Sequence, residues 1–94
     1  MKPTIGRIVE YRLSQQDAVA IAARRRLQAH AFEIFQGNRV AEGDTFPAMI
    51  VRVWGEAPES AVQLQVFLDG TDTYWATSVQ VGEGPRTYSW PIRA

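Results

Sequence analysis

The sequence contains no cysteine, so it can form neither a disulfide nor a thiolate metal site. Its single histidine, His30, is too little for a histidine cluster of the kind that binds zinc. No apolar run approaches the ~20 residues that a membrane-spanning helix needs, and no apolar signal segment follows the first residues. These absences predict a cytoplasmic protein that binds no metal, uses no cofactor and does not enter a membrane.

Net charge is also absent, because ten basic residues balance ten acidic ones. Without an overall positive field, binding to nucleic acid through bulk charge is not expected. Only Lys2 is a lysine, and every other basic residue is an arginine. This bias has two interpretations: a GC-rich genome, or planar, bidentate recognition of phosphate or carboxylate groups.

The 94 residues suffice for a single domain, residues 1–94, and 46% of them are apolar, which supports one core. A core of this size gives a thin margin of stability for one protomer. The sequence therefore favours a homo-oligomer, in which an interface extends the core.

Alternation of apolar and polar residues predicts five strands, over residues 5–13, 47–54, 61–68, 71–79 and 86–90. In the first strand, Ile5, Val9, Tyr11 and Leu13 share one side. In the second, Met49, Val51 and Val53 point one way, and Ile50, Arg52 and Trp54 point the other. In the third, Val62, Leu64, Val66 and Leu68 are predicted to face the core.

A helix is predicted after the first strand. Ser14 is a good N-cap and Asp17 follows three residues later, in the manner of a capping box. Residues 15–26 are rich in Ala and Arg, with a modest apolar stripe of Val19, Ile21 and Ala22. Residues 27–35 either extend this helix towards Gly37-Asn38 or form a short strand, and the helix is favoured.

Asp69-Gly70 is typical of a two-residue hairpin turn, because a primed turn needs positive φ. Such a turn pairs Leu68 with Thr71, which places Trp75 in the core and Tyr74 on the outer face. A three-residue loop would reverse this, since a slip of one residue turns every side chain to the other face.

A strand, a helical insertion, three consecutive strands and a short closing strand are the elements of a mainly β domain with one helix (α+β). We expect a small SH3-like β-barrel with the helix inserted after the first strand. The alternative is an open antiparallel sheet with one helix packed across it. Closure would remove the edge strands, which favours the barrel.

Three segments carry a resemblance to known sequences: KPTIGRIVEYRLS at residues 2–14, AEGDTFPAMIVRVWG at 41–55 and VFLDGTDTYWATSVQVGEGPRTYSWP at 66–91. Together they resemble a group of short uncharacterised proteins found mostly in tailed phages and prophages. The resemblance implies a phage accessory protein that acts by binding, and such proteins often disable a host enzyme or sequester a host signal. It supplies no catalytic residues.

No catalytic or metal-binding constellation stands out in the sequence. His30 is the only candidate for a histidine base, and it has no identifiable nucleophile or orienting partner. Asp44, Asp69 and Asp72 could hold a hard cation, but Asp is favoured around a hairpin for turn chemistry alone. Residues 82–85 (GEGP) lead into a strand, so they are a turn and not a phosphate loop. We therefore do not expect an enzyme.

The outward side of the predicted strands has an unusual composition: Arg52, Trp54, Gln63, Gln65, Phe67 and Tyr74. Arg86, with Tyr88 or Trp90, could join them from the last strand. Aromatic planes can stack a base, and Arg can hold phosphate, but the same residues also form protein-binding hot spots. Alternatively, the helix covers this side as a second half of the core.

The run Arg24-Arg25-Arg26 spans about 300° of a helix, so its members cannot all face one phosphate. It either forms a solvated last turn that complements the helix dipole, or one or two members reach an anionic ligand.

The leading hypothesis is a counter-defence protein of phage type that sequesters a small nucleotide-type signalling molecule. The alternative is an SH3-like interaction module that inhibits a host protein. The candidate ligand-binding residues are Arg24, Arg25, Arg52, Trp54, Gln65, Phe67, Tyr74, Arg86 and Tyr88.

Overall fold

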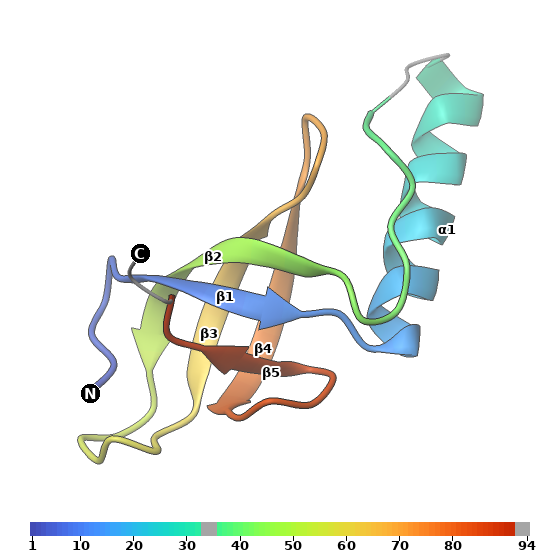
Figure 1. Ribbon diagram of the computed structural model, residues 1–94. Helices are drawn as coiled ribbons and strands as arrows, with labels where there is room; N and C mark the ends of the chain where they lie inside the picture. The colour runs from blue at the N-terminus through green and yellow to red at the C-terminus, as the bar shows by residue number, and fades with distance from the viewer. Residues whose placement is uncertain (33–35, 92–94) are drawn as a thin grey trace.

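The computed structural model describes residues 1–32 and 36–91. Within these ranges the chain forms a helix and five strands: β1 (Ile8–Arg12), α1 (Gln15–Phe32), β2 (Thr45–Val53), β3 (Val62–Phe67), β4 (Thr73–Val81) and β5 (Thr87–Ser89). The strands close into a barrel in sequence order (Figure 1). Strand β5 pairs antiparallel with β1 and parallel with β4. The predicted small SH3-like barrel with a helix after the first strand is confirmed, and the open sheet is excluded.

The core is the inside of this barrel, where every strand contributes buried side chains. The inward side of the third strand was predicted correctly, since Val62, Leu64, Val66 and Leu68 are all buried. Each such side chain stabilises the fold by about 1.5–3 kcal/mol relative to an exposed one. The buried cluster consists of Val9, Tyr11, Leu13, Ile21, Val40, Ala48, Ile50, Val62, Leu64, Val66, Leu68, Ala76, Val79 and Tyr88.

Strand β1 is shorter than predicted at its N-terminal end. Val9, Tyr11 and Leu13 are buried as expected, but Ile5 is 71% exposed. The chain turns at Gly6, which has a φ of 92°, before β1 begins. Such a φ is accessible to glycine without steric cost, so the turn separates Ile5 from the strand.

The predicted sides of β2 are wrong at its centre. Ile50 is fully buried, whereas Val51 is 38% exposed. The register with β3 shifts between Ile50 and Arg52, which marks a β-bulge. Because the extra residue reverses the alternation, Val53 returns towards the core after the bulge.

The predicted register of the β3–β4 hairpin is also wrong. Phe67 pairs with Thr73 and Val66 with Tyr74, so the two-residue turn does not form. Gly70, outside the left-handed region, instead forms a bridge to Gly37. The slip by one residue turns Trp75 outwards, where it is 58% exposed, and Tyr74 inwards, where it packs against the core.

Bonds to the segment after the helix explain this register. Asn38 N donates to Asp69 O at 2.8 Å, and Thr71 N donates to Gln36 O at 2.6 Å. These bonds hold the hairpin tip against residues 36–38, so a local Asp-Gly turn gives way to tertiary pairing.

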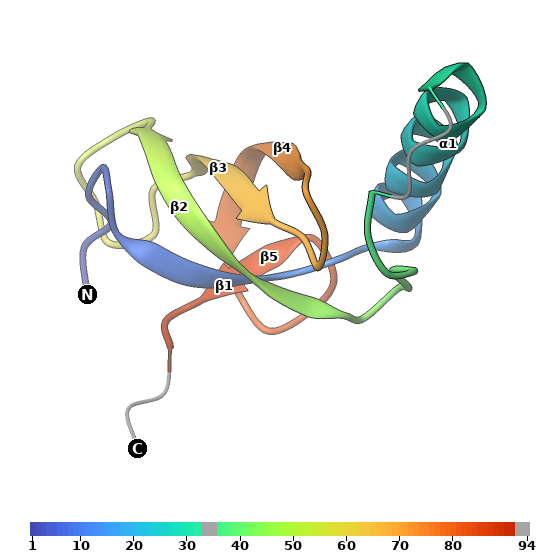
Figure 2. The same cartoon turned by 90° about the horizontal axis from the view of Figure 1, so that it is seen from above.

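Helix α1 extends beyond the predicted residues 15–26 as far as Phe32, which favours the helical alternative for residues 27–32. Residues 33–35 lie outside the described part. The helix stands beyond one end of the barrel and does not cover its wall (Figures 1 and 2), and the molecule measures 44 × 24 × 23 Å. No helical segment in the described ranges has the length and apolar character needed to cross a membrane.

The predicted apolar stripe of the helix is only partly correct, because the helix meets the barrel along a narrow line. Ile21 is fully buried, but Val19 is 61% exposed and Ala22 is also exposed. The inward line is instead Asp17, Ile21, Arg24 and Arg25, spaced as residues on one helix face.

The N-terminal end of the helix is fixed by Asp17, which is 3% exposed. The predicted capping box forms: Asp17 N donates to Ser14 Oγ at 3.1 Å, and Ser14 N donates to Asp17 Oδ2 at 2.9 Å. The carboxylate also accepts hydrogen bonds from Tyr11 Oη of β1 at 2.5 Å and from Tyr74 Oη of β4 at 2.8 Å. One carboxylate thus joins the helix to two strands.

Further along the helix, two arginines bind the hairpin. Arg25 donates to Asp72 through Nε at 2.9 Å and through an Nη at 2.7 Å, which is a bidentate pair. Arg24 donates to the same carboxylate at 2.7 Å. The hydrogen bond from Arg25 is the main cause that lowers the pKa of Asp72. These bonds clamp the second half of the helix to the β3–β4 tip.

The close approach of Gly37 and Gly70 gives a stability prediction. A Cβ on Gly70 would lie 2.7 Å from the Cα of Gly37 and clash with backbone atoms. Gly70→Ala should therefore lower the free energy of unfolding by about 1–3 kcal/mol in chemical denaturation. Gly84→Ala is the matched control, since nothing lies within 4 Å of its Cβ. Equal effects of the two substitutions would contradict the close contact.

The Asp17 network predicts how stability depends on pH. Burial, and then the bond to Asp17, raise the pKa of Tyr74 from 10.0 to about 12. The pKa values of Tyr11 and Tyr88 are raised as well, in both cases chiefly by burial. Because a raised tyrosine pKa stabilises the fold fully below the unfolded value, stability should fall as pH rises from about 10 to 12.

In the measurement, tyrosinate absorbance is followed beside circular dichroism. Tyrosinate should appear only as the fold is lost, because all three tyrosines of the chain are protected.

On the acid side, burial alone would raise the pKa of Asp17, but bonds from Ser14, Tyr11 and Tyr74 lower it. Its stabilisation is thus present above about pH 4 and lost as pH falls further. Ordinary tyrosine ionisation in an intact fold would refute the network.

Candidate binding site

The candidate site lies on the outer face, which we define as the outward side chains of β2, β3 and β4 together with Trp54. Met49 pairs with Gln65 and Gln65 with Trp75, so these three side chains form a row across the strands. In the next row Phe67, which is 40% exposed, pairs with Thr73. Large apolar side chains therefore reach solvent on a wall that the helix leaves uncovered.

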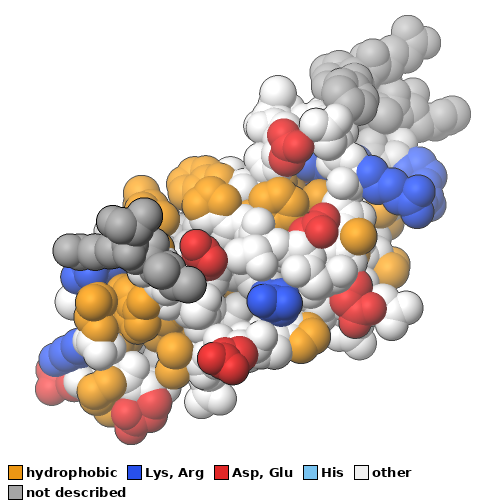
Figure 3. Space-filling view, in the orientation of Figure 1, with side chains coloured by type: hydrophobic (Ala, Val, Ile, Leu, Met, Phe, Trp, Pro, Cys, Tyr) orange, Lys and Arg blue, Asp and Glu red, His pale blue; other side chains and the backbone are white. Residues whose placement is uncertain are grey.

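The space-filling view gives a wider picture of the surface (Figure 3). Hydrophobic side chains reach the surface in several places over the barrel, and acidic and basic ones are interspersed. The basic side chains gather most clearly on the helix, away from the barrel. The face in view therefore shows no concentration of a single charge over the barrel.

A shallow hollow of about 440 Å³ lies on the outer face, and we call it the Trp hollow. It is lined by Val51, Arg52, Trp54, Gln63 and Trp75. The two indoles are 54% and 58% exposed, which is high for side chains of this size. The Arg52 guanidinium lies over the Trp54 ring, 4.7 Å from its centre, in a cation–π contact.

Two β-bulges build this hollow. The first, in β2, exposes Val51 and places Arg52 directly opposite Gln63. The second lies between β3 and β4, where the register shifts between Val62 and Leu64. Ser78, opposite this shift, has a φ of 51°, a left-handed conformation that is uncommon outside glycine. Strands β2 and β4, the two neighbours of β3, therefore both bend opposite Gln63.

Gln63 is the polar centre of the arrangement, and only 8% of it is exposed. Its Oε1 accepts hydrogen bonds from Trp54 Nε1 at 3.2 Å and from Ser78 N at 2.6 Å. These two bonds stabilise the bulged backbone and orient the Trp54 ring beside the hollow.

Two of the predicted aromatic site residues point into the barrel and not onto the outer face. Tyr88 is fully buried in the core, because β5 turns it inwards opposite Tyr11. Its hydroxyl has no hydrogen-bond partner among the described residues. Tyr74 faces inwards through the slipped hairpin register and donates to Asp17. Neither can contact a ligand on the outer face.

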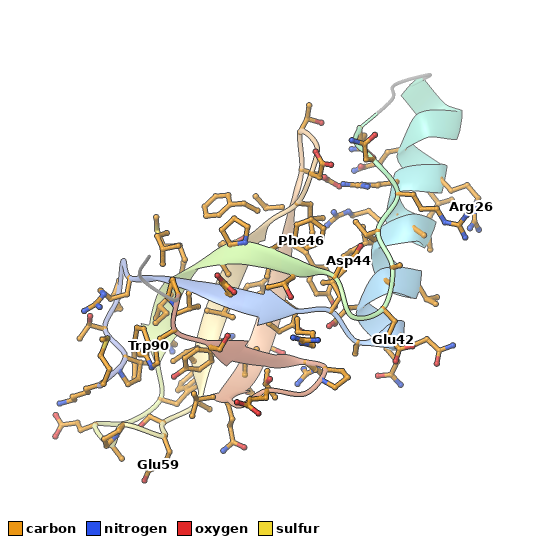
Figure 4. All side chains as sticks on the ribbon, in the orientation of Figure 1. Arg26, Glu42, Asp44, Phe46, Glu59 and Trp90 are labelled. Carbon is orange, nitrogen blue, oxygen red and sulfur yellow. The ribbon has the colours of Figure 1, made fainter. Side chains whose placement is uncertain are left out.

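The predicted anion-binding arginines of the helix have a structural role instead. Arg24 and Arg25 bind Asp72, and Arg25 also donates to Asn38 O at 2.6 Å. Arg26 is exposed and points away from the barrel (Figure 4). Arg86 is exposed, but its guanidinium donates to Thr77 O at 3.0 Å and it does not line the Trp hollow.

Four predicted residues do lie on the outer face: Arg52, Trp54, Gln65 and Phe67. The sequence prediction missed Trp75 and treated Gln63 as an ordinary outward residue. Trp75 could have been found by weighing the three-residue hairpin loop, which turns it outwards. No local signal marks Gln63, because its role depends on bulges in the two neighbouring strands.

The three carboxylates considered for a cation site are each bonded within the fold. The side chain of His30 lies outside the described part. Asp72 binds two arginines, Asp69 accepts a bond from Asn38, and Asp44 accepts one from Ala41 N. In the part of the chain that the structure describes, no three His, Asp or Glu side chains form a group that could hold a metal ion.

A second cleft of about 550 Å³ lies between β1, β5 and the β4–β5 loop. Its lining mixes two carboxylates, Glu10 and Glu83, with Arg12 and several hydroxyls. Trp90 closes the cleft at the end of the barrel away from the helix (Figure 4). The lining is mixed and Trp90 in it is partly buried, whereas two largely exposed indoles line the Trp hollow, so we place the candidate site in the latter.

Comparison of the chain with protein-family models, with curated proteins and with solved structures gives no match in any of the three. The resemblance to phage proteins therefore stays a prediction, and the case for the site depends on its geometry.

The high exposure of Trp75 predicts that it contributes little to folding. Trp75→Ala should change the free energy of unfolding by only about 0.5 kcal/mol, as surface substitutions do. Leu64→Ala, on the same sheet but fully buried, should cost about 2–5 kcal/mol. Chemical denaturation of both variants tests this, and a large loss in Trp75→Ala would mean that the indole belongs to the core.

Proposed function

We propose that this chain is an accessory protein of phage type that acts by binding a host protein through the Trp hollow and the surrounding outer face. The observation that carries the proposal is the exposure of two indoles, 54% and 58%, beside Arg52 on one uncovered wall. Tryptophan and arginine are the side chains most enriched in the hot spots of protein interfaces.

The positions of the other candidate residues also favour a protein over a nucleotide as the ligand. A nucleotide needs cations for its phosphates as well as aromatic planes for its base. Arg24 and Arg25 are engaged by Asp72, and Arg86 lies away from the hollow. Among the described residues, Arg52 is the one basic side chain that lines it, and the rest of that lining is mainly apolar.

The test uses the purified protein to capture partners from a bacterial lysate, followed by direct binding measurements with the identified and purified partner. Trp75→Ala should weaken that binding by about 30-fold or more, the effect of a hot spot of ~2 kcal/mol. Leu27→Ala is the control, since Leu27 is 73% exposed on the helix. It should bind like the natural protein.

Two results would contradict the proposal. The partner could bind Trp75→Ala with unchanged affinity, or its binding could be lost only in Leu27→Ala. Sedimentation of the natural protein and of Trp75→Ala separates a host partner from self-association. If the natural protein forms an oligomer that Trp75→Ala does not form, the face is occupied by a second copy of the chain.

Sequestration of a small nucleotide-type signal is the second candidate, favoured by the cation–π pair of Arg52 and Trp54 beside Trp75. A volume of about 440 Å³ is within the usual range for small ligands. A thermal-shift panel of cyclic mono-, di- and trinucleotides separates the candidates. A ligand at about 100 times its Kd stabilises by ~2.7 kcal/mol, a shift of several degrees. A shift abolished by Trp75→Ala would favour the nucleotide.

A further inference from the structure

We infer that the Trp hollow recognises a carboxylate on an apolar segment of the partner protein, held jointly by the Gln63 side-chain amide and the Arg52 guanidinium. This inference rests on the proposed function and names the chemistry of the segment that binds: an Asp or Glu side chain flanked by apolar residues.

The first step is the orientation of the Gln63 amide. Trp54 Nε1 and Ser78 N are both N–H donors, and both point at the same atom of Gln63. Only the carbonyl oxygen can accept from them, so the network identifies this atom as Oε1 and leaves Nε2 as the other end. No described residue accepts a hydrogen bond from Nε2. A side chain that is 8% exposed therefore presents an unused donor at the hollow.

The second step is the state of Arg52. Its guanidinium lies over the Trp54 ring, 4.7 Å from the ring centre, and its N–H groups donate no hydrogen bond to a described residue. Arg52 makes no ion pair with a described residue and is exposed. Because Arg52 and Gln63 are directly opposed across β2 and β3, their side chains start from neighbouring positions.

The third step is the chemistry of the whole hollow. The groups of Gln63 and Arg52 that remain free are donors only, and one of them carries a positive charge. The remaining lining, Val51, Trp54 and Trp75, is apolar or aromatic. The complement of this surface is an acceptor with negative charge beside apolar side chains. A carboxylate on an apolar segment meets each requirement, and the Arg fork binds it in bidentate geometry.

The test compares two short peptides with acetylated and amidated ends. In one, a single Glu stands between leucines and serines (Ser-Leu-Glu-Leu-Ser), and in the other Gln replaces Glu. The blocked ends make the Glu side chain the one carboxylate of the pair. Titrations followed by NMR should show the Glu peptide binding at least about tenfold more tightly to the natural protein, and this preference should shrink as salt is added.

Two variants with matched controls locate the recognition. Arg52→Gln should abolish the preference for Glu, whereas Arg26→Gln removes the same charge from the exposed side of the helix and should preserve it. Gln63→Glu keeps an oxygen for Trp54 and Ser78 but replaces the Nε2 donor with an acceptor, so it should also abolish the preference. Gln80→Glu, which is exposed on β4, should leave it intact.

A measurement on the natural protein covers the case in which Gln63→Glu does not fold. The side-chain amide protons of Gln63 should shift on addition of the Glu peptide, and those of Gln80 should not. Equal affinity for the two peptides, or a preference that survives Arg52→Gln, would overturn the inference. The proposed function is tested separately, by whether the affinity for an identified host protein depends on Trp75.

Discussion

The start of the helix is held against the barrel by a single buried carboxylate. Asp17 accepts hydrogen bonds from the backbone of its own capping box, from Tyr11 on β1 and from Tyr74 on β4. A carboxylate buried without such donors would be costly, so its removal from water is offset only because all of these partners are in place. This requirement links the start of the helix to β1, which precedes it, and to β4, which is distant in sequence. It therefore also links the helix to the closing of the barrel.

A different polar side chain organises the outer face. Gln63 satisfies the indole of Trp54 and the backbone of Ser78, and it lies between two bulges that break the regular alternation. Bulges often re-aim side chains at sites of function. In this barrel they expose Val51 and set Arg52 against Trp54, while the slipped hairpin register brings Trp75 to the rim of the same hollow.

The sequence predicted the fold well and the site only in part. Alternation and the Ser14–Asp17 capping box are local signals, and they placed β3 and the start of the helix correctly. The side chains of Tyr74 and Trp75 were predicted on the wrong faces because the hairpin register is decided by bonds to residues 36–38, far away in sequence. Likewise, Arg24 and Arg25 have the composition of an anion site, but the partner that uses them, Asp72, becomes apparent only when the hairpin tip meets the helix.

The helix stands beyond the end of the barrel and is fastened there by Asp17, Ile21 and the arginine clamp on Asp72. Its contribution to stability is therefore made at a distance from Trp54 and Trp75. Substitutions on the open wall can accumulate without loosening the helix, whereas changes at the arginine clamp would disturb the hairpin register that turns Trp75 outwards. In a chain of 94 residues, the side chains that fasten the helix and those exposed on the open wall are thus different residues, linked through one hairpin tip.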